Sequence, residues 1–173
     1  MSLLNTGIAS RLCNACGLCC NGVMFHTVRL QAADNPQDLV KSGLHIQRKK
    51  GGHLFQQPCP AYRESCCSIY DLRPTRCRLF QCQQLKRLSA GETTEAEALE
   101  KIQNVQTLVS TITKLLNQAG PTNEKRPLAK RCEKILAEPA TEPEMIALHQ
   151  RLTQETRDLE LILDADFRIV QTD

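Results

Sequence analysis

Four cysteines fall within eight positions near the start of the chain, in the stretch CNACGLCC. Cys13, Cys16 and Cys19 follow a C-x2-C-x2-C spacing, which is typical of the loop around one face of an iron–sulfur cluster. Such a loop is usually completed by a distant cysteine followed by proline, and Cys59-Pro60 has this form. Zinc would instead take Cys13 and Cys16 as one pair and two more thiolates from downstream. The spacing favours an iron–sulfur cluster or iron, with zinc as the alternative.

Cys19 and Cys20 are neighbours in the sequence, and this vicinal pair limits how the thiols are shared. Side chains of adjacent residues diverge, and a disulfide between neighbours is strained. Two adjacent thiolates therefore serve one small ion poorly. The sequence predicts that Cys19 and Cys20 face different partners, either in two metal sites or on two sides of one multinuclear site.

More cysteines follow in the stretches PCPAY and CSIYDLRPTRCRLFQC. Taken in order, these motifs resemble the YkgJ-type cysteine-cluster family, the zinc- or iron-chelating CxxCxxCC domain, over about residues 10–88. The module is also similar to the cysteine-rich part of flagellin lysine methylases, but the chain shows no glycine-rich cofactor loop, so methylation is not carried over. Cys67 is preferred to Cys66 because it directly precedes the motif SIY. The resemblance implies eight metal ligands: Cys13, Cys16, Cys19, Cys20, Cys59, Cys67, Cys77 and Cys82.

Arg73, Arg76 and Arg78 bracket Cys77 in the stretch RPTRCR. Four thiolates around Zn²⁺ leave a formal charge of about −2, as does a four-thiolate iron–sulfur cube, so two sites carry about −4. Guanidinium groups can offset this charge, donate hydrogen bonds to sulfur and tune a redox potential. We therefore predict that these three arginines lie beside the cofactor.

The composition explains why metal would be needed. Nine of the ten cysteines lie before residue 83, and only 3% of the residues are aromatic. With so little apolar material, the cysteine-rich half needs another source of stability, and metal coordination is the obvious one. Cys132 lies beyond, on an apolar helical face, and is interpreted as a buried cysteine.

Charge and hydropathy restrict the partners. Residues 1–90 carry twelve basic and four acidic residues (+8), and residues 91–173 carry ten and fifteen (−5). Scarce aromatic residues and the acidic second half argue against a dedicated nucleic-acid binder. No stretch has the pattern of a signal peptide or membrane span, so we expect a cytoplasmic protein with reduced thiols. The expected partners are a metal ion or cluster and an unspecified protein; the oligomeric state stays open.

The elements that must position these cysteines define a small α-rich protein with two parts. Residues 10–90 form an irregular cysteine-cluster module, and residues 91–173 form a helical hairpin layer packed on it. In the module we expect a loop at 11–22 that can include a helical turn. We also expect strands at 23–25 and 28–30, a helix at 36–42, a hairpin of 44–49 with 53–57, and helix within 74–86.

The second part has plainer signals. Thr94 and Glu97 form a capping box ahead of a helix that continues to about residue 118. Shorter periodic patterns predict helices at 127–137 and 143–163, and FRIV predicts a strand at 167–170.

Three functions fit this sequence. The preferred one is a metal-binding protein with an iron–sulfur cluster and a role in electron transfer or redox chemistry. The others are a structural zinc module that shapes an interaction surface, and an accessory or catalytic metalloprotein in protein modification. No general base or nucleotide loop accompanies the cysteines, so no catalytic residue is assigned.

Overall fold

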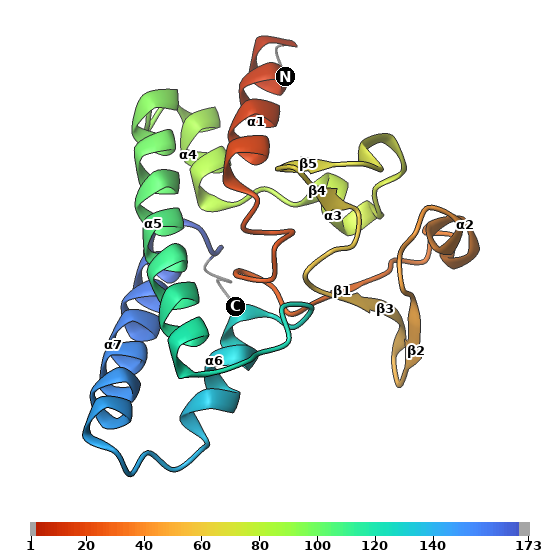
Figure 1. The fold of residues 1–173 in the computed structure, drawn as a ribbon. Coiled ribbons are helices and arrows are strands. Elements are labelled where there is room, and N and C mark those ends of the chain that lie inside the picture. Colours follow the sequence, from red (N-terminus) through yellow and green to blue (C-terminus); the bar gives the residue numbers. More distant parts are fainter. Residues whose placement is uncertain (1–2, 170–173) are drawn as a thin grey trace.

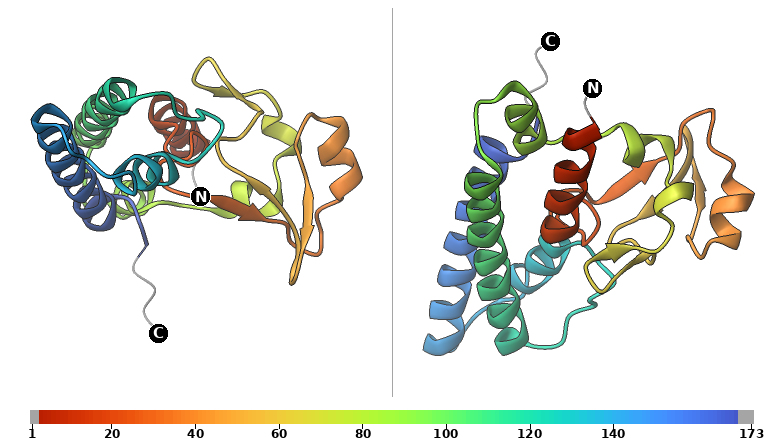
Figure 2. Two further views of the ribbon diagram at one scale, coloured as in Figure 1. Left: turned by 60° about the horizontal axis from the view of Figure 1, so that its bottom comes forward. Right: turned by 90° about the horizontal axis from the view of Figure 1, so that it is seen from above.

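The computed structural model describes residues 3–169 as a layer of helices beside a smaller part built from short strands (Figure 1). Helices α5 (Glu95–Ala119) and α7 (Pro143–Asp166) run side by side, and α1 (Leu3–Cys16) packs against α5 (Figure 2). The predicted small α-rich fold with short strands is confirmed. Within the described range, no helix combines the length and apolarity required to cross a membrane.

Helix α5 begins at the predicted capping box. Thr94 Oγ1 accepts a hydrogen bond from the Glu97 amide (3.2 Å), and the Glu97 carboxylate accepts one from the Thr94 amide (2.8 Å). Two amides that helix geometry leaves without partners are thus satisfied. The helix presents one apolar face to its neighbours, with buried side chains at Ala98, Ile102, Val105, Ile112, Leu115 and Leu116.

Helices α6 (Leu128–Leu136) and α7 confirm the two predicted shorter helices. Cys132 is 2% exposed on α6, as expected for a buried apolar cysteine. The predicted strand at 167–170 is wrong for 167–169: the Phe167 amide bonds to the Leu163 carbonyl (3.0 Å) and its buried ring ends α7. Val170 lies outside the described residues.

The smaller part contains an antiparallel sheet in the order β1-β3-β2. It confirms the predicted hairpin, with β2 (Gln47–Lys49) paired to β3 (Gly52–Gln56). The strand expected at 28–30 is also confirmed, as β1 (Thr27–Arg29) on the other side of β3. Helix α2 (Pro36–Lys41) confirms the predicted short helix. The expected strand at 23–25 is wrong, because the chain bends at Val23 and Met24 and this segment joins no sheet.

Two further differences concern the cysteines directly. The segment 11–22, expected as a loop, begins inside α1, which continues to Cys16. The helix expected within 74–86 is broken into α3 (Thr75–Leu79) and α4 (Gln83–Ala90). The break has a packing cause, because Phe80 turns out of the helix to meet Phe25 edge to face, with ring centroids 5.1 Å apart. Cys77 therefore lies within α3, whereas Cys82 is the N-cap residue of α4.

Buried apolar side chains form two separate clusters. The larger one, with eighteen buried residues, fills the helical layer and includes Leu12 of α1 and Phe167 after α7. The smaller one has only five: Val28, Leu39, Leu44, Phe55 and Ala61. The predicted boundary between two parts near residue 90 falls where α4 ends at Gly91, and it stays a prediction.

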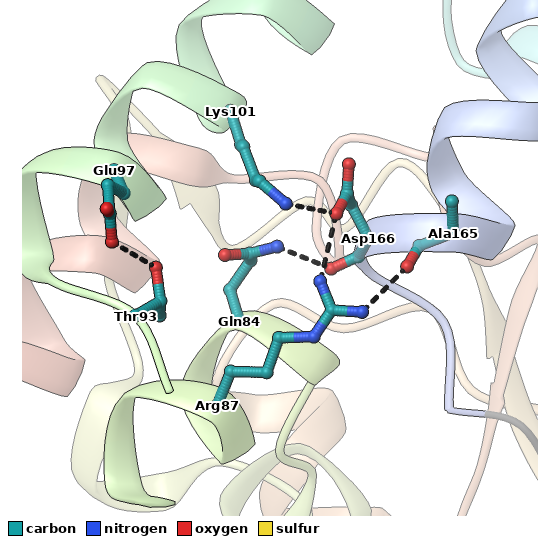
Figure 3. A network of polar contacts seen from close by, with 7 residues as sticks. All are labelled: Gln84, Arg87, Thr93, Glu97, Lys101, Ala165 and Asp166. Carbon is teal, nitrogen blue, oxygen red and sulfur yellow. Dashed lines mark hydrogen bonds and ion pairs between the residues drawn. The ribbon is translucent and has the colours of Figure 1, made fainter. Parts of the chain in front are cut away.

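A polar network ties α4, α5 and α7 together at the end of the layer (Figure 3). The Asp166 carboxylate accepts hydrogen bonds from Arg87 Nη1 (3.0 Å) and from Lys101, and its backbone carbonyl accepts one from Gln84 Nε2 (2.7 Å). The carboxylate side chain is only 23% exposed. Two cations thus share one anion in a partly buried setting.

We expect Asp166→Asn to lower the free energy of unfolding by about 1–3 kcal/mol, because it leaves two partly buried cations without their anion. Chemical denaturation measures this loss. Glu133→Gln is the control, since Glu133 pairs with Lys130 in an exposed i,i+3 contact. That control should cost under about 1 kcal/mol. Equal losses in both variants would contradict the prediction.

Candidate metal centre

All ten cysteines are free thiols. The nine cysteines of the first half come from six places in the chain, and only Cys13 and Cys66 among the ten are exposed. Their positions are the end of α1 (Cys13, Cys16), the turn after it (Cys19, Cys20), the loop after β3 (Cys59), strand β5 (Cys66–Cys67), α3 (Cys77) and the N-cap of α4 (Cys82).

The turn after α1 depends on Gly17. Its φ of 65° lies in the left-handed region, where it ends the helix, and its amide bonds to the Cys13 carbonyl (3.1 Å). The phenol of Tyr62 lies against it: a Cβ on Gly17 would sit 1.9 Å from Tyr62 Oη. The chain can therefore reverse and bring Cys19 and Cys20 back toward the end of α1.

A first group of thiols consists of Cys13, Cys16, Cys19 and Cys82. Burial is the largest cause of the raised pKa of the first three, taking Cys16 to about 12 and Cys19 well above its usual value. In all three, negative charge on Cys82 raises the pKa further. Cys82 also packs against the larger hydrophobic cluster, as Cys16 and Cys19 do.

A second group consists of Cys20, Cys59, Cys67 and Cys77. Burial raises the pKa of Cys20 to about 12 and that of Cys77 to about 11. Charges on Cys59, Cys77 and Cys67 raise the pKa of Cys20 further, in that order of size. Cys59 and Cys67 act on Cys77 in the same way. The two groups adjoin each other, since the charge on Cys20 raises the pKa of Cys19 more than the charge on Cys13 does, and Cys13 has a smaller effect on Cys20.

The peptide that joins Cys19 to Cys20 is held by a segment from the other side of the site. Gln57 Nε2 donates to the Cys19 carbonyl (3.0 Å), and the Cys59 amide donates to the Cys20 carbonyl (2.8 Å). Gln57 is 2% exposed, so this contact is shielded from water. These two contacts hold the backbone of the vicinal pair at the junction of the two groups.

Backbone amides point at several sulfur atoms. Leu18 donates to Cys16, Ala61 donates to Cys59, and the first amides of α4 donate to Cys82. Each of these hydrogen bonds opposes the rise in pKa that burial causes. Amides that stabilise negative sulfur are a regular feature of thiolate metal sites, because they spread the ligand charge.

The predicted arginines differ in their positions. Arg73 acts on both groups, since its charge lowers the pKa of Cys13 in one and of Cys77 in the other, against the larger effect of burial. Its guanidinium stacks on the Tyr70 ring, 3.6 Å from the centroid. Arg76 and Arg78 are exposed on α3. A role for all three beside a cofactor stays a prediction.

Sequence reasoning missed Gly17, Gln57 and Tyr62 as parts of the site. The glycine and the tyrosine stand inside the motifs CNACGLCC and PCPAY, so motif position was an available signal for both. The sequence contains no signal for Gln57, because no local pattern predicts that a glutamine is buried.

The donor set fits the metals that the sequence suggests. Four thiolates per group suit zinc and iron–sulfur clusters equally. In residues 3–169, however, no three Cys, His, Asp or Glu side chains are already arranged to hold an ion. Coulomb effects reach further than metal–sulfur bonds of about 2.3 Å, so the thiols are neighbours that must still close in. Metal binding would therefore be coupled to local ordering of these segments.

The fold and the two thiol groups define a cysteine-cluster protein of the metal-chelating class. The sequence model of the CxxCxxCC family, described as "Putative zinc- or iron-chelating domain", matches residues 12–102. The chain therefore belongs to the CxxCxxCC family, which confirms the resemblance and extends it into α5. Comparison with curated proteins and with solved structures found no match.

Proposed function

We propose that the protein binds metal through two adjacent four-thiolate sites. The first is formed by Cys13, Cys16, Cys19 and Cys82, and the second by Cys20, Cys59, Cys67 and Cys77. The observation that carries this proposal is the packing of Cys16, Cys19 and Cys82 against one hydrophobic cluster and of Cys59 and Cys77 against another, with the Cys59 amide bonded to the Cys20 carbonyl (2.8 Å). Free thiols on this scale favour a reducing compartment such as the cytoplasm.

The C-x2-C-x2-C spacing favours iron–sulfur clusters over zinc in these sites. A bound cluster would supply one-electron redox chemistry, and electron transfer is then the preferred role. The protein contributes eight thiolates, amides that donate to sulfur, and the Arg73 cation between the groups.

Elemental analysis of protein purified without oxygen tests the proposal. Two zinc ions, or iron with sulfide and absorbance near ~400 nm, are expected. Protein that carries no stoichiometric metal would contradict it. Colourless protein with two zinc ions would keep the two sites and reject the redox role.

Neighbouring cysteines provide a matched pair of variants. Cys67→Ser should lose one of the two metals, since Cys67 is half-buried and interacts with Cys20, Cys59 and Cys77. Cys66→Ser should lose none, because Cys66 is exposed on the same strand. Metal content per chain is the measurement. Loss of metal from the Cys66 variant alone would reassign the ligand.

A further inference from the structure

The two thiol groups are attached to different hydrophobic clusters. Cys16, Cys19 and Cys82 pack against the larger cluster, which has eighteen buried residues in the helical layer. Cys59 and Cys77 pack against the smaller cluster of five. The vicinal pair therefore lies between two hydrophobic clusters of very different size, as well as between the two thiol groups.

Without metal, the smaller cluster has few buried side chains to stabilise the part of the chain around it. It must order the sheet β1-β3-β2, helix α2 and the loops around them with five buried apolar side chains. Scaffolds of this size, about 40–50 residues, generally require a disulfide or a metal in addition to their core. The cysteines of the chain are free thiols, so metal in the second group is the available support.

The helical layer does not need metal to stay folded. Helices α1, α5 and α7 pack around their own core, and the Asp166 network closes one end (Figures 1 and 3). The first group lies at the edge of this layer. It also contains Cys13, the only exposed thiol among the eight proposed ligands.

Building on the proposed function, we infer that the two sites have different tasks. The site of Cys20, Cys59, Cys67 and Cys77 is structural and holds the strand-rich part folded. The site of Cys13, Cys16, Cys19 and Cys82 is not needed for folding: its metal can leave while both hydrophobic clusters stay folded. The inference rests on the size of the two clusters against which the two groups pack.

Chelator challenge of the purified full chain tests this division, with EDTA for bound zinc or bathophenanthroline disulfonate for bound iron. One site should empty at least about tenfold faster than the other, with amide exchange in β1 and β3 unchanged. The slower loss should coincide with complete loss of protection in β1 and β3, while α5 and α7 stay protected.

Two variants show which site gives the fast phase of metal loss and which gives the slow phase. Cys16→Ser should abolish only the fast phase and keep the β1 and β3 amides protected. Cys77→Ser should abolish the slow phase and remove that protection, and Cys66→Ser, the control, should retain both phases. Equal rates for both sites in the wild type, or protection lost in Cys16→Ser and kept in Cys77→Ser, would overturn the division of tasks alone. Wild-type protein with fewer than two metal sites would overturn the proposed function with it.

Discussion

Replacing Gly17 with alanine is expected to lower the free energy of unfolding by about 2–4 kcal/mol. Two costs combine. The residue has φ of 65°, where a Cβ strains the backbone, and that Cβ would lie 1.9 Å from Tyr62 Oη and 2.6 Å from its Cζ. The ring cannot swing aside at its tip alone, because Cε2 is also only 3.3 Å away. Chemical denaturation in the presence of saturating metal measures the loss.

Gly91→Ala separates the two costs. Gly91 has a similar φ of 74°, at the left-handed end of α4, and nothing lies within 4 Å of its added Cβ. This control should lose only the backbone part, about 1 kcal/mol. Adding Tyr62→Ala to Gly17→Ala should recover part of the loss relative to the sum of the single changes. If Gly17→Ala costs no more than Gly91→Ala, the Tyr62 ring does not constrain the turn.

The helical layer was predictable from the sequence because its signals are local. Capping at Thr94 and apolar residues at helical spacing define α5 without reference to any other part of the chain. Helix α1 has weaker local signals and escaped prediction. It is stabilised from outside, by Leu12 buried against the larger cluster and by an ion pair of Arg11 Nε with Glu95 (2.9 Å).

The sequence identifies the cysteines of the candidate site, but it does not predict which cysteines lie together. Spacing and motif identify the cysteines, but which of them meet depends on distant segments. The β4 (Tyr62–Arg63) and β5 (Cys66–Cys67) hairpin, which aims Cys67, turns through Glu64 and Ser65 with φ of 48° and 62°. Neither residue is a usual choice for that conformation, so no turn signal marks it.

The vicinal pair shows how one covalent feature can organise the whole molecule. Gln57 Nε2 and the Cys59 amide hold the Cys19 and Cys20 carbonyls, so the backbone at the junction of the two groups is fixed. Those groups pack against different clusters. The same peptide bond thus connects the two proposed metal sites and the two hydrophobic clusters.

Phe167 is the residue whose loss should damage the helical layer most. It is fully buried, and its backbone carbonyl accepts a hydrogen bond from the Gln83 amide (3.0 Å), directly after Cys82. We expect Phe167→Ala to lower the free energy of unfolding by about 3–5 kcal/mol, because a large cavity replaces the ring in the larger cluster. Thermal and chemical unfolding both measure this loss.

The Phe167 variant should also affect metal selectively. Loosening the start of α4 displaces Cys82, so the first site should lose its metal to chelator faster than in the wild type, with the second site unchanged. Leu161→Ala is the control, since Leu161 is 59% exposed on the outer side of α7 and should change stability by no more than about 0.5 kcal/mol. A Phe167→Ala variant as stable as this control would show that the end of α7 does not anchor α4. Faster metal loss from both sites would show that Cys82 is not confined to the first group.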